Sequence, residues 1–471
     1  MNQLRAPHSE LARQWVHIGS VLFALLLRVL NGWQSSLLAL TAFVFNLLLL
    51  PRLGGRVLYR PEDEARGFPL GILLYPLSVL ALTLIFPSRL DIAAAAWAIL
   101  ACGDGAATLI GRNVSTINAE SAERAEKRGS AGSASSAFER GRLPWNPDKS
   151  IAGTLAFIVF GGAAGVAFAW WVRPAVTPMP ALAFTIAAPL VAAFVAALVE
   201  TIPIRLDDNL SVPATAGAVL WLASLMSVAL LTGARETIIA ALPWAIGVNV
   251  LTGWLGYRAR TVSVSGAVGG GLVGAIIYVG GGGGAWVLLL VTFLAASITS
   301  RMGLARKERL GIAEERGGRR GAGNAMANCG VAAIAAIAVV STPYPVAALI
   351  ALVAALAAGG SDTVASEIGK AWGRSAFLVT TFSRVKAGTS GAMSLEGTVA
   401  GIAAAFALAA AGAALGLISF FSIPVIVVAA TAGALVESAL GATLEGPGIL
   451  NNDMLNFINT AVAAAVALAI A

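Results

Sequence analysis

The sequence has few charged residues and almost no cysteine. Only 12% of its 471 residues are Asp, Glu, Lys or Arg, about half of the share in soluble proteins, which excludes an ordinary soluble domain. Its two cysteines, Cys102 and Cys329, lie in separate apolar segments, so we expect neither a disulfide framework nor a metal cluster. The pattern G-x-x-x-x-G-K-[ST] does not occur, which excludes a P-loop.

Apolar residues instead make up 58% of the chain. They gather in segments near the roughly 20 residues that a helix needs to cross the hydrocarbon layer. We therefore predict an all-α, polytopic integral membrane protein with about 15 transmembrane helices. The predicted spans lie near residues 15–30, 34–50, 68–86, 92–111, 151–172, 181–199, 213–231, 237–256, 264–279, 285–299, 328–340, 344–360, 396–418, 423–440 and 456–471. Residues 328–340 are few enough to form a half-helix or a re-entrant segment instead.

Basic residues are concentrated in alternate loops. Residues 112–150 contain seven basic and five acidic residues, and residues 301–320 contain seven basic and three acidic ones. Both segments fall on the cytoplasmic side if the amino terminus is cytoplasmic, as the positive-inside rule requires. The net charge of +7 therefore indicates orientation in a lipid bilayer, and we expect no nucleic-acid partner.

Three short blocks of sequence occur in the same order in both halves of the chain. The matched pairs are residues 103–112 with 361–370, 150–154 with 394–398, and 197–200 with 434–437. Both copies fall on the same side of the predicted membrane, which is typical of a parallel repeat. The sequence therefore predicts two related modules, 1–232 and 233–471.

Charged residues at one membrane edge of the first module indicate a phosphate and metal site. Ionisable groups are costly there and are therefore candidates for function. Carboxylates with phosphate oxygens suit Mg²⁺, Lys149 precedes a helix start that would bind phosphate, and His17 could serve as a general base. The predicted catalytic residues are His17, Asp104, Lys149, Glu200, Asp207 and Asp208, of which Asp104 and Asp208 would bind the metal. The predicted nucleotide- and phosphate-binding residues are Arg13, Gly103, Gly105, Arg112, Asn146, Asp148, Ser150 and Asn209. The alternative is that these residues are solvated loop residues, membrane anchors and packing glycines.

The second module combines acidic residues with hydroxyls, amides and several cations. This combination suits phosphate oxygens, and its arginines suit a substrate that already carries negative charge. We predict Asp362 and Glu367 as catalytic residues, with Asp362 also a ligand of Mg²⁺. The predicted binding residues are Ser300, Arg319, Arg320, Asn324, Asn328, Lys370, Arg384, Lys386, Gly388, Thr389, Ser394, Glu437 and Asn456.

The two halves resemble two families of lipid kinases. Residues 10–19, 103–105, 143–150, 200 and 207–209 resemble the polyprenol kinase group, which includes phytol kinase and dolichol kinase and, more distantly, the phosphatidate cytidylyltransferases. Gln14 departs from the Lys that this group often has. Residues 263–270, 320–328, 361–369, 388–398 and 451–459 resemble the family that contains phytyl phosphate kinase. Met326 and Ala392 depart from the pattern of that family.

The resemblance implies a natural fusion of two consecutive kinases. The first module would convert a prenyl alcohol such as phytol or geranylgeraniol to the monophosphate, and the second would convert the prenyl monophosphate to the diphosphate. CTP is the implied donor, with Mg²⁺, and the expected location is a bacterial inner membrane with the active sites facing the cytoplasm. Three alternatives stay open: a CTP-dependent cytidylyltransferase acting on a lipid phosphate, a transporter of an anionic lipid, and one active module with a regulatory partner.

Overall fold

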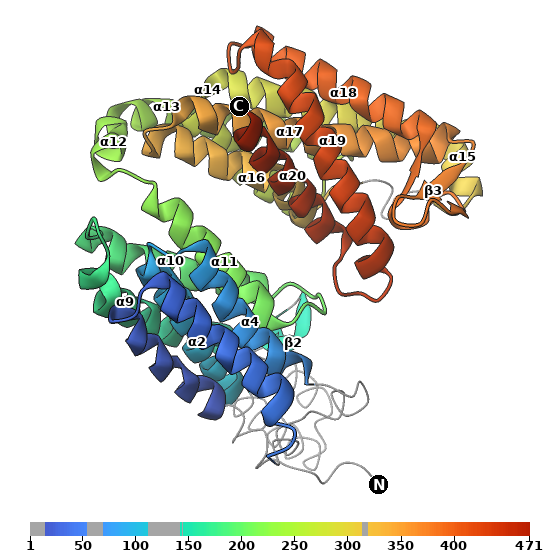
Figure 1. The fold of residues 1–471 in the computed structure, drawn as a ribbon. Coiled ribbons are helices and arrows are strands. Elements are labelled where there is room, and N and C mark those ends of the chain that lie inside the picture. Colours follow the sequence, from blue (N-terminus) through green and yellow to red (C-terminus); the bar gives the residue numbers. More distant parts are fainter. Residues whose placement is uncertain (1–14, 54–68, 112–141, 144, 313–318) are drawn as a thin grey trace, which may run out of the picture. The chain divides into compact units, whose positions relative to one another are not determined.

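The structure is a computed structural model that describes residues 15–53, 69–111, 142–143, 145–312 and 319–471 (Figure 1). The described residues contain eleven helices that are long and apolar enough to cross a membrane. Two shorter apolar helices occupy Trp15–Arg28 and Leu70–Ile85. The predicted all-α, polytopic membrane architecture is confirmed, whereas the count of about 15 spans is not.

The long helix α14 (Val264–Arg301) explains part of the difference in the count. It contains both predicted spans 264–279 and 285–299 in 38 residues, and its backbone leaves the helical conformation only at Gly282, where φ is 81°. A residue without a Cβ tolerates this positive φ. Helix α16 (Ala322–Ser341) has 20 residues, so the half-helix alternative for 328–340 is wrong. Its first turns consist of small and polar residues, which extend the helix beyond the apolar segment.

The chain divides into two compact units, Met1–Ser224 and Leu225–Ala471. The predicted boundary, between residues 232 and 233, lies within α12 (Val228–Gly233), shortly after the boundary of the units. Each unit is described separately below.

Unit 1 is built around one buried helix, α5 (Leu90–Ala98). All nine of its residues are buried, and it packs against η1, α9, α10 and α11. Its alanines allow neighbouring helices to approach closely. The other elements are η1 (Ser20–Arg28), α2 (Gly32–Val44), η2 (Phe45–Leu49), α4 (Leu70–Ile85), η4 (Ile99–Asp104), β1 (Arg142–Leu143), β2 (Asn146–Ser150), α8 (Ile151–Ala156), η5 (Phe157–Gly161), α9 (Gly162–Val172), η6 (Arg173–Ala175), α10 (Leu182–Glu200) and α11 (Asp208–Ser224).

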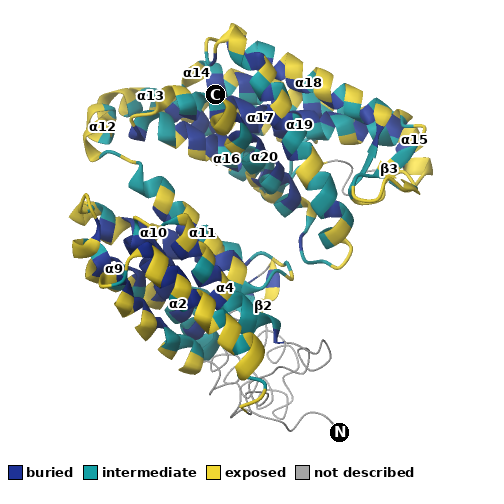
Figure 2. Ribbon diagram, in the orientation of Figure 1, coloured by how far each residue is buried: buried dark blue, intermediate teal, exposed yellow. Residues whose placement is uncertain are grey.

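Unit 2 has a corresponding central helix, α17 (Pro345–Trp372), which appears mostly dark blue in Figure 2. It packs against α14, α16, α18, α19 and α20. A Cβ on Gly360 would lie 2.7 Å from the side chains of Thr292 and Leu408, so only glycine permits this close packing. The other elements are α13 (Arg235–Arg258), α15 (Leu304–Arg309), β3 (Ala376–Leu378), β4 (Arg384–Val385), β5 (Ala392–Ser394), α18 (Leu395–Ala414), η8 (Phe420–Ser422), α19 (Ile423–Leu440), η9 (Gly441–Glu445) and α20 (Asn452–Ile470).

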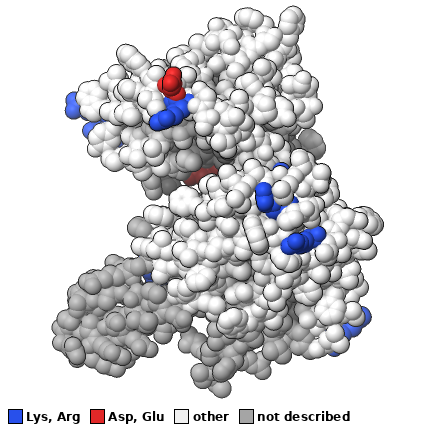
Figure 3. Space-filling view, turned by 90° about the vertical axis from the view of Figure 1, so that its left-hand side faces the viewer, with Lys and Arg blue, Asp and Glu red and all other residues white. Residues whose placement is uncertain are grey.

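Large apolar side chains cover the outer faces of the helices. Trp244 and Val250 of α13, for example, are 69% and 67% exposed. Few charged side chains interrupt the face shown in Figure 3. Exposed apolar surface of this extent suits contact with lipid rather than water.

Short strands lie in the polar connections, where the sequence analysis predicted none. β1 and β2 form an antiparallel pair in unit 1, and unit 2 has a three-stranded sheet in the order β4-β3-β5. Strands of two to five residues carry too short an alternation of apolar and polar residues to be recognised. β2 and β5 each lead directly into a helix, and this places their last residues beside the sites described next.

Candidate functional site

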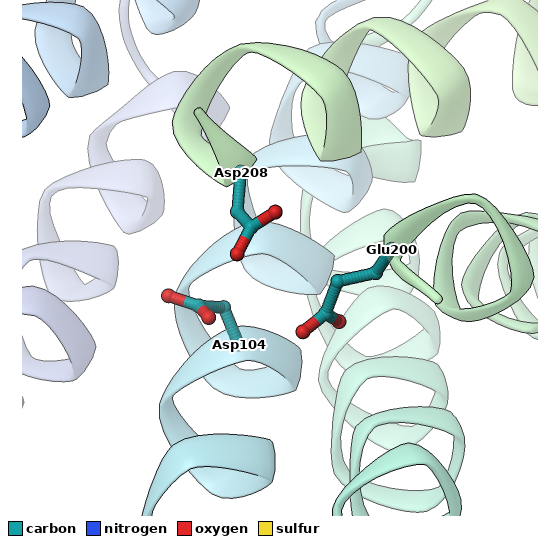
Figure 4. Close-up of side chains that lie close together, drawn as sticks. All are labelled: Asp104, Glu200 and Asp208. Carbon is teal, nitrogen blue, oxygen red and sulfur yellow. The ribbon is translucent and has the colours of Figure 1, made fainter. Parts of the chain in front are cut away.

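Three carboxylates of unit 1 point toward one another (Figure 4). Asp104 ends η4, Glu200 ends α10 and Asp208 begins α11. One carboxylate oxygen from each lies within 4.8 Å of the others. Oxygen ligands at this separation fit a divalent cation such as Mg²⁺. Their close approach follows from packing, because α10 and α11 lie against each other and both contact η4.

Lys149 completes the cluster. Its Nζ lies 2.6 Å from Oε1 of Glu200 and 3.3 Å from Oδ2 of Asp208. Burial would lower the pKa of the Lys149 ammonium, but the carboxylates of Glu200 and Asp208 outweigh burial and raise this pKa above its usual range. Lys149 is therefore a fixed positive charge that neutralises part of the cluster.

Two side chains hold the β2 segment against the end of α10. The Asn146 amide donates to the carbonyl of Thr201 at 3.1 Å, and the Trp145 indole donates to the Thr201 hydroxyl at 3.2 Å. Oδ1 of Asn146 accepts from the backbone N–H of Asp148. These contacts use both ends of the Asn146 amide and position Lys149, whereas Asp148 itself is exposed.

His17 lies at the edge of the same cluster. Its Nε2 is 3.7 Å from Oδ2 of Asp104, and its ring meets Tyr75 edge-on with the centroids 4.5 Å apart. Asp207 and Asn209, by contrast, form a local turn, in which Oδ1 of Asp207 accepts from the backbone and side-chain amides of Asn209 at 2.9 and 2.8 Å. The predicted binding residues Arg13 and Arg112 lie outside the described residues.

The predicted glycines of unit 1 pack tightly. A Cβ on Gly103 would meet the ring of Phe157 at 2.9 Å, and Gly105 is buried. Close helix packing alone accounts for Gly103 at this position.

Unit 2 contains a cavity of about 600 Å³ between α17, α19 and the β3–β5 sheet. Its volume is that of a small-molecule site. Seven of the predicted site residues line it, namely Asp362, Lys370, Arg384, Gly388, Thr389, Ser394 and Glu437. Gly388 has a φ of 85°, which glycine adopts without strain.

Other predicted residues of unit 2 are not part of the described lining of this cavity, namely Ser300, Arg319, Arg320, Asn324, Asn328, Glu367, Lys386 and Asn456. Some of them contact one another instead. Arg320 donates to the hydroxyl of Ser300 at 3.4 Å, and the Asn328 amide donates to the carbonyl of Asn324 at 3.0 Å.

Glu367 forms a buried ion pair with Lys307, which is not among the predicted site residues. The two side chains are 3% and 1% exposed, and Lys307 also donates to the carbonyl of Ser300 at 2.7 Å. The other oxygen of Glu367 lies 3.4 Å from Nζ of Lys370, which lines the cavity. Lys307 occurs in a basic segment, where sequence does not distinguish a buried lysine from a membrane anchor.

Replacing Lys307 by Met should destabilise the protein by about 3–5 kcal/mol, because Glu367 would keep a buried charge without its main partner. Thermal unfolding in detergent measures the change. The double variant Lys307→Met with Glu367→Met should recover most of the loss. Arg306→Met, at an exposed neighbouring position, should change stability by no more than about 0.5 kcal/mol. Equal unfolding temperatures for the Lys307 and Arg306 variants would contradict this prediction.

The repeated sequence blocks make the same local contacts in both units. A Cβ on Gly111 would lie 3.1 Å from Oγ of Ser150, and a Cβ on Gly369 would lie 2.9 Å from Oγ of Ser394. Each serine caps the helix that follows it, accepting from Gly153 at 3.0 Å or from Gly397 at 3.1 Å. Asp104 and Asp362 also lie on the two most buried of the candidate spans. Ser150 and Ser394 therefore make the same local contacts in their own units.

Comparison with known proteins identifies relatives in bacteria, archaea and plants. Residues 247–464 match the family described as integral membrane protein DUF92. The chain is 42% identical to an uncharacterized membrane protein of Synechocystis, over 42% of this chain and 78% of that protein. It is 36% identical to the chloroplastic protein VTE6 of Arabidopsis thaliana, over 50% of this chain and 75% of that protein.

A third relative has a more specific name. The chain is 29% identical to probable phytol kinase 1 of Glycine max, over 32% of this chain and 42% of that protein. No solved structure matches the chain. Since the chain covers more than two thirds of two relatives that are over 30% identical to it, it belongs to the DUF92 family of integral membrane proteins.

Proposed function

We propose that the protein is a membrane isoprenoid kinase that phosphorylates a prenyl alcohol in unit 1 and the resulting prenyl monophosphate in unit 2. Two relatives, from Glycine max and Oryza sativa, are named probable phytol kinases and are each 29% identical to the chain. The observation that carries the proposal is the cluster of three carboxylates and Lys149 at the ends of apolar helices. A prenyl tail can stay in the bilayer there while its head group reaches the charges.

The donor set of unit 1 fits Mg²⁺, because Asp104, Glu200 and Asp208 offer three oxygen ligands that converge on one point. The ion would neutralise charge on the donor phosphates, which is the main requirement of phosphoryl transfer. Lys149 would bind an oxygen of the donor phosphate. His17, held beside Asp104, would accept the proton of the substrate hydroxyl at Nε2.

In unit 2 the cavity would hold the nucleotide and the head group of the monophosphate. Asp362 would bind Mg²⁺, and Lys370, Arg384 and the turn at Gly388 surround the same space. Among the described residues, Lys386, Arg319 and Arg320 do not line this cavity, so we assign the phosphates of the donor and the acceptor to Lys370 and Arg384, which do. The donor would be CTP. The monophosphate stays in the membrane after the first step, so that a tethered second site meets it at a raised effective concentration.

We place both sites on the cytoplasmic side of a bacterial inner membrane, because the basic loops lie there under the positive-inside rule. CTP and Mg²⁺ are available in that compartment.

The proposal is tested by incubating the purified protein with labelled phytol, Mg²⁺ and either CTP or ATP, and then separating the lipids. We expect monophosphate first, then diphosphate, with CDP released. Release of pyrophosphate with a cytidylylated lipid would support the cytidylyltransferase instead. If no diphosphate forms from phytol or from supplied monophosphate, unit 2 does not have the proposed activity. Absence of any phosphorylated lipid would refute the proposal.

A further inference from the structure

The acidic sites of the two units differ at two equivalent positions. Lys149 directly precedes Ser150, and Met393 directly precedes Ser394, which has the same capping contact. Asp208 begins α11, and Asn452 begins α20. Unit 2 therefore has two neutral residues where unit 1 has an ion pair of 3.3 Å.

Two acidic groups of unit 2 lie together. The side chains of Asp362 on α17 and Glu437 on α19 are within hydrogen-bonding reach of each other, and both line the cavity with Met393. Lys370, the cation that acts on Asp362, pairs with Glu367. Asp362 and Glu437 together carry the two negative charges that one divalent cation neutralises, and Glu445 lines the same cavity.

An amide beside this pair makes no hydrogen bond of regular geometry within the described part of the chain. Asn459 of α20 is 1% exposed and adjoins Glu437. Neither Nδ2 nor Oδ1 of Asn459 has a hydrogen-bond partner of regular geometry among the described residues, and the same holds for the buried Oε2 of Glu437. Gly433, one turn before Glu437, leaves the room that Asn459 occupies. Buried polar atoms without partners cost about 1–3 kcal/mol each, and a ligand bound between these side chains would remove that cost.

We infer that Asp362, Glu437 and Asn459 form a divalent-cation site that is ready to bind, whereas the cation site of unit 1 has Lys149 as an internal competitor. Carboxylate and amide oxygens are the ligands that Mg²⁺ and Mn²⁺ prefer. Met393 leaves the carboxylates of unit 2 without a lysine at the position that Lys149 takes in unit 1. The role of the ion, beside a cavity that would hold a triphosphate, rests on the proposed function, but its binding does not.

The test is titration of the purified full-length protein with Mn²⁺, followed by electron paramagnetic resonance without nucleotide or lipid. All variants carry Asp104→Asn, which disrupts the cluster of unit 1. Glu437→Gln and Asn459→Leu should each weaken the remaining Mn²⁺ binding by about 10- to 100-fold, the range seen when partners of a metal site are lost. Met393→Lys should weaken it at least as much, because the added ammonium would occupy the position of the cation. Glu308→Gln, which removes the same charge from an exposed position, should leave it unchanged.

The inference is overturned if Glu437→Gln binds Mn²⁺ as tightly as Glu308→Gln. Glu437→Gln could fail to fold, which thermal unfolding would show. In that case the inference is overturned if Asn459→Leu and Met393→Lys both bind Mn²⁺ with unchanged affinity. If Mn²⁺ binding responds as expected but the protein without any substitution has no kinase activity, the cation site is supported and the proposed function is refuted. If the protein without any substitution is an active kinase but Glu437→Gln binds Mn²⁺ as before, the proposed function is supported and the cation site is refuted.

Discussion

Replacing Asp362 by Asn should lower diphosphate formation roughly 10²- to 10³-fold and leave the prenyl monophosphate to accumulate, because the site loses the carboxylate that would bind the metal ion. Asn has nearly the same size as Asp, so the packing of the buried α17 is preserved. The measurement is the rate of diphosphate formation from supplied phytyl monophosphate and CTP.

The matched control is Glu308→Gln, which also removes one negative charge from unit 2 but at an exposed residue of α15. It should convert the monophosphate at the normal rate. Phosphorylation of phytol should be normal in both variants, since unit 1 is unchanged. If Asp362→Asn and Glu308→Gln form diphosphate equally fast, Asp362 has no part in the second reaction.

Replacing Asp104 by Asn should block the other step. We expect monophosphate formation from phytol to fall by a similar factor of roughly 10²–10³, because the cluster of Glu200 and Asp208 would keep Lys149 but lose one metal ligand. Supplied monophosphate should still be converted to diphosphate. The measurement is the initial rate with each substrate in turn.

Asp362→Asn serves as the reciprocal control for Asp104→Asn, because the two variants should fail on opposite substrates. Loss of both activities in either variant would show that the units do not act as separate sites. Normal phosphorylation of phytol by Asp104→Asn would remove Asp104 from the first site and leave the carboxylate cluster as a structural feature.

The sequence predicted where the carboxylates of the candidate sites lie, but it did not predict which side chains pair with them. Asp104, Glu200 and Asp208 stand at the ends of apolar segments, and the helices bring those ends together. Glu367 was predicted as catalytic, whereas the structure pairs it with the buried Lys307. Nothing in the spacing of Glu367 and Lys307 distinguishes this pair from the other charges of the polar loops.

By itself the sequence determined that the protein is a helical membrane protein and that its charges gather at helix ends. These properties follow from local composition, because a segment that crosses lipid must be apolar and must satisfy its own backbone hydrogen bonds. Only the tertiary structure decided that Lys149 lies between two carboxylates and that Asn459 adjoins Glu437. Such contacts depend on how helices distant in the sequence pack, and small residues such as Gly433 fix that packing through shape, which local hydropathy does not record.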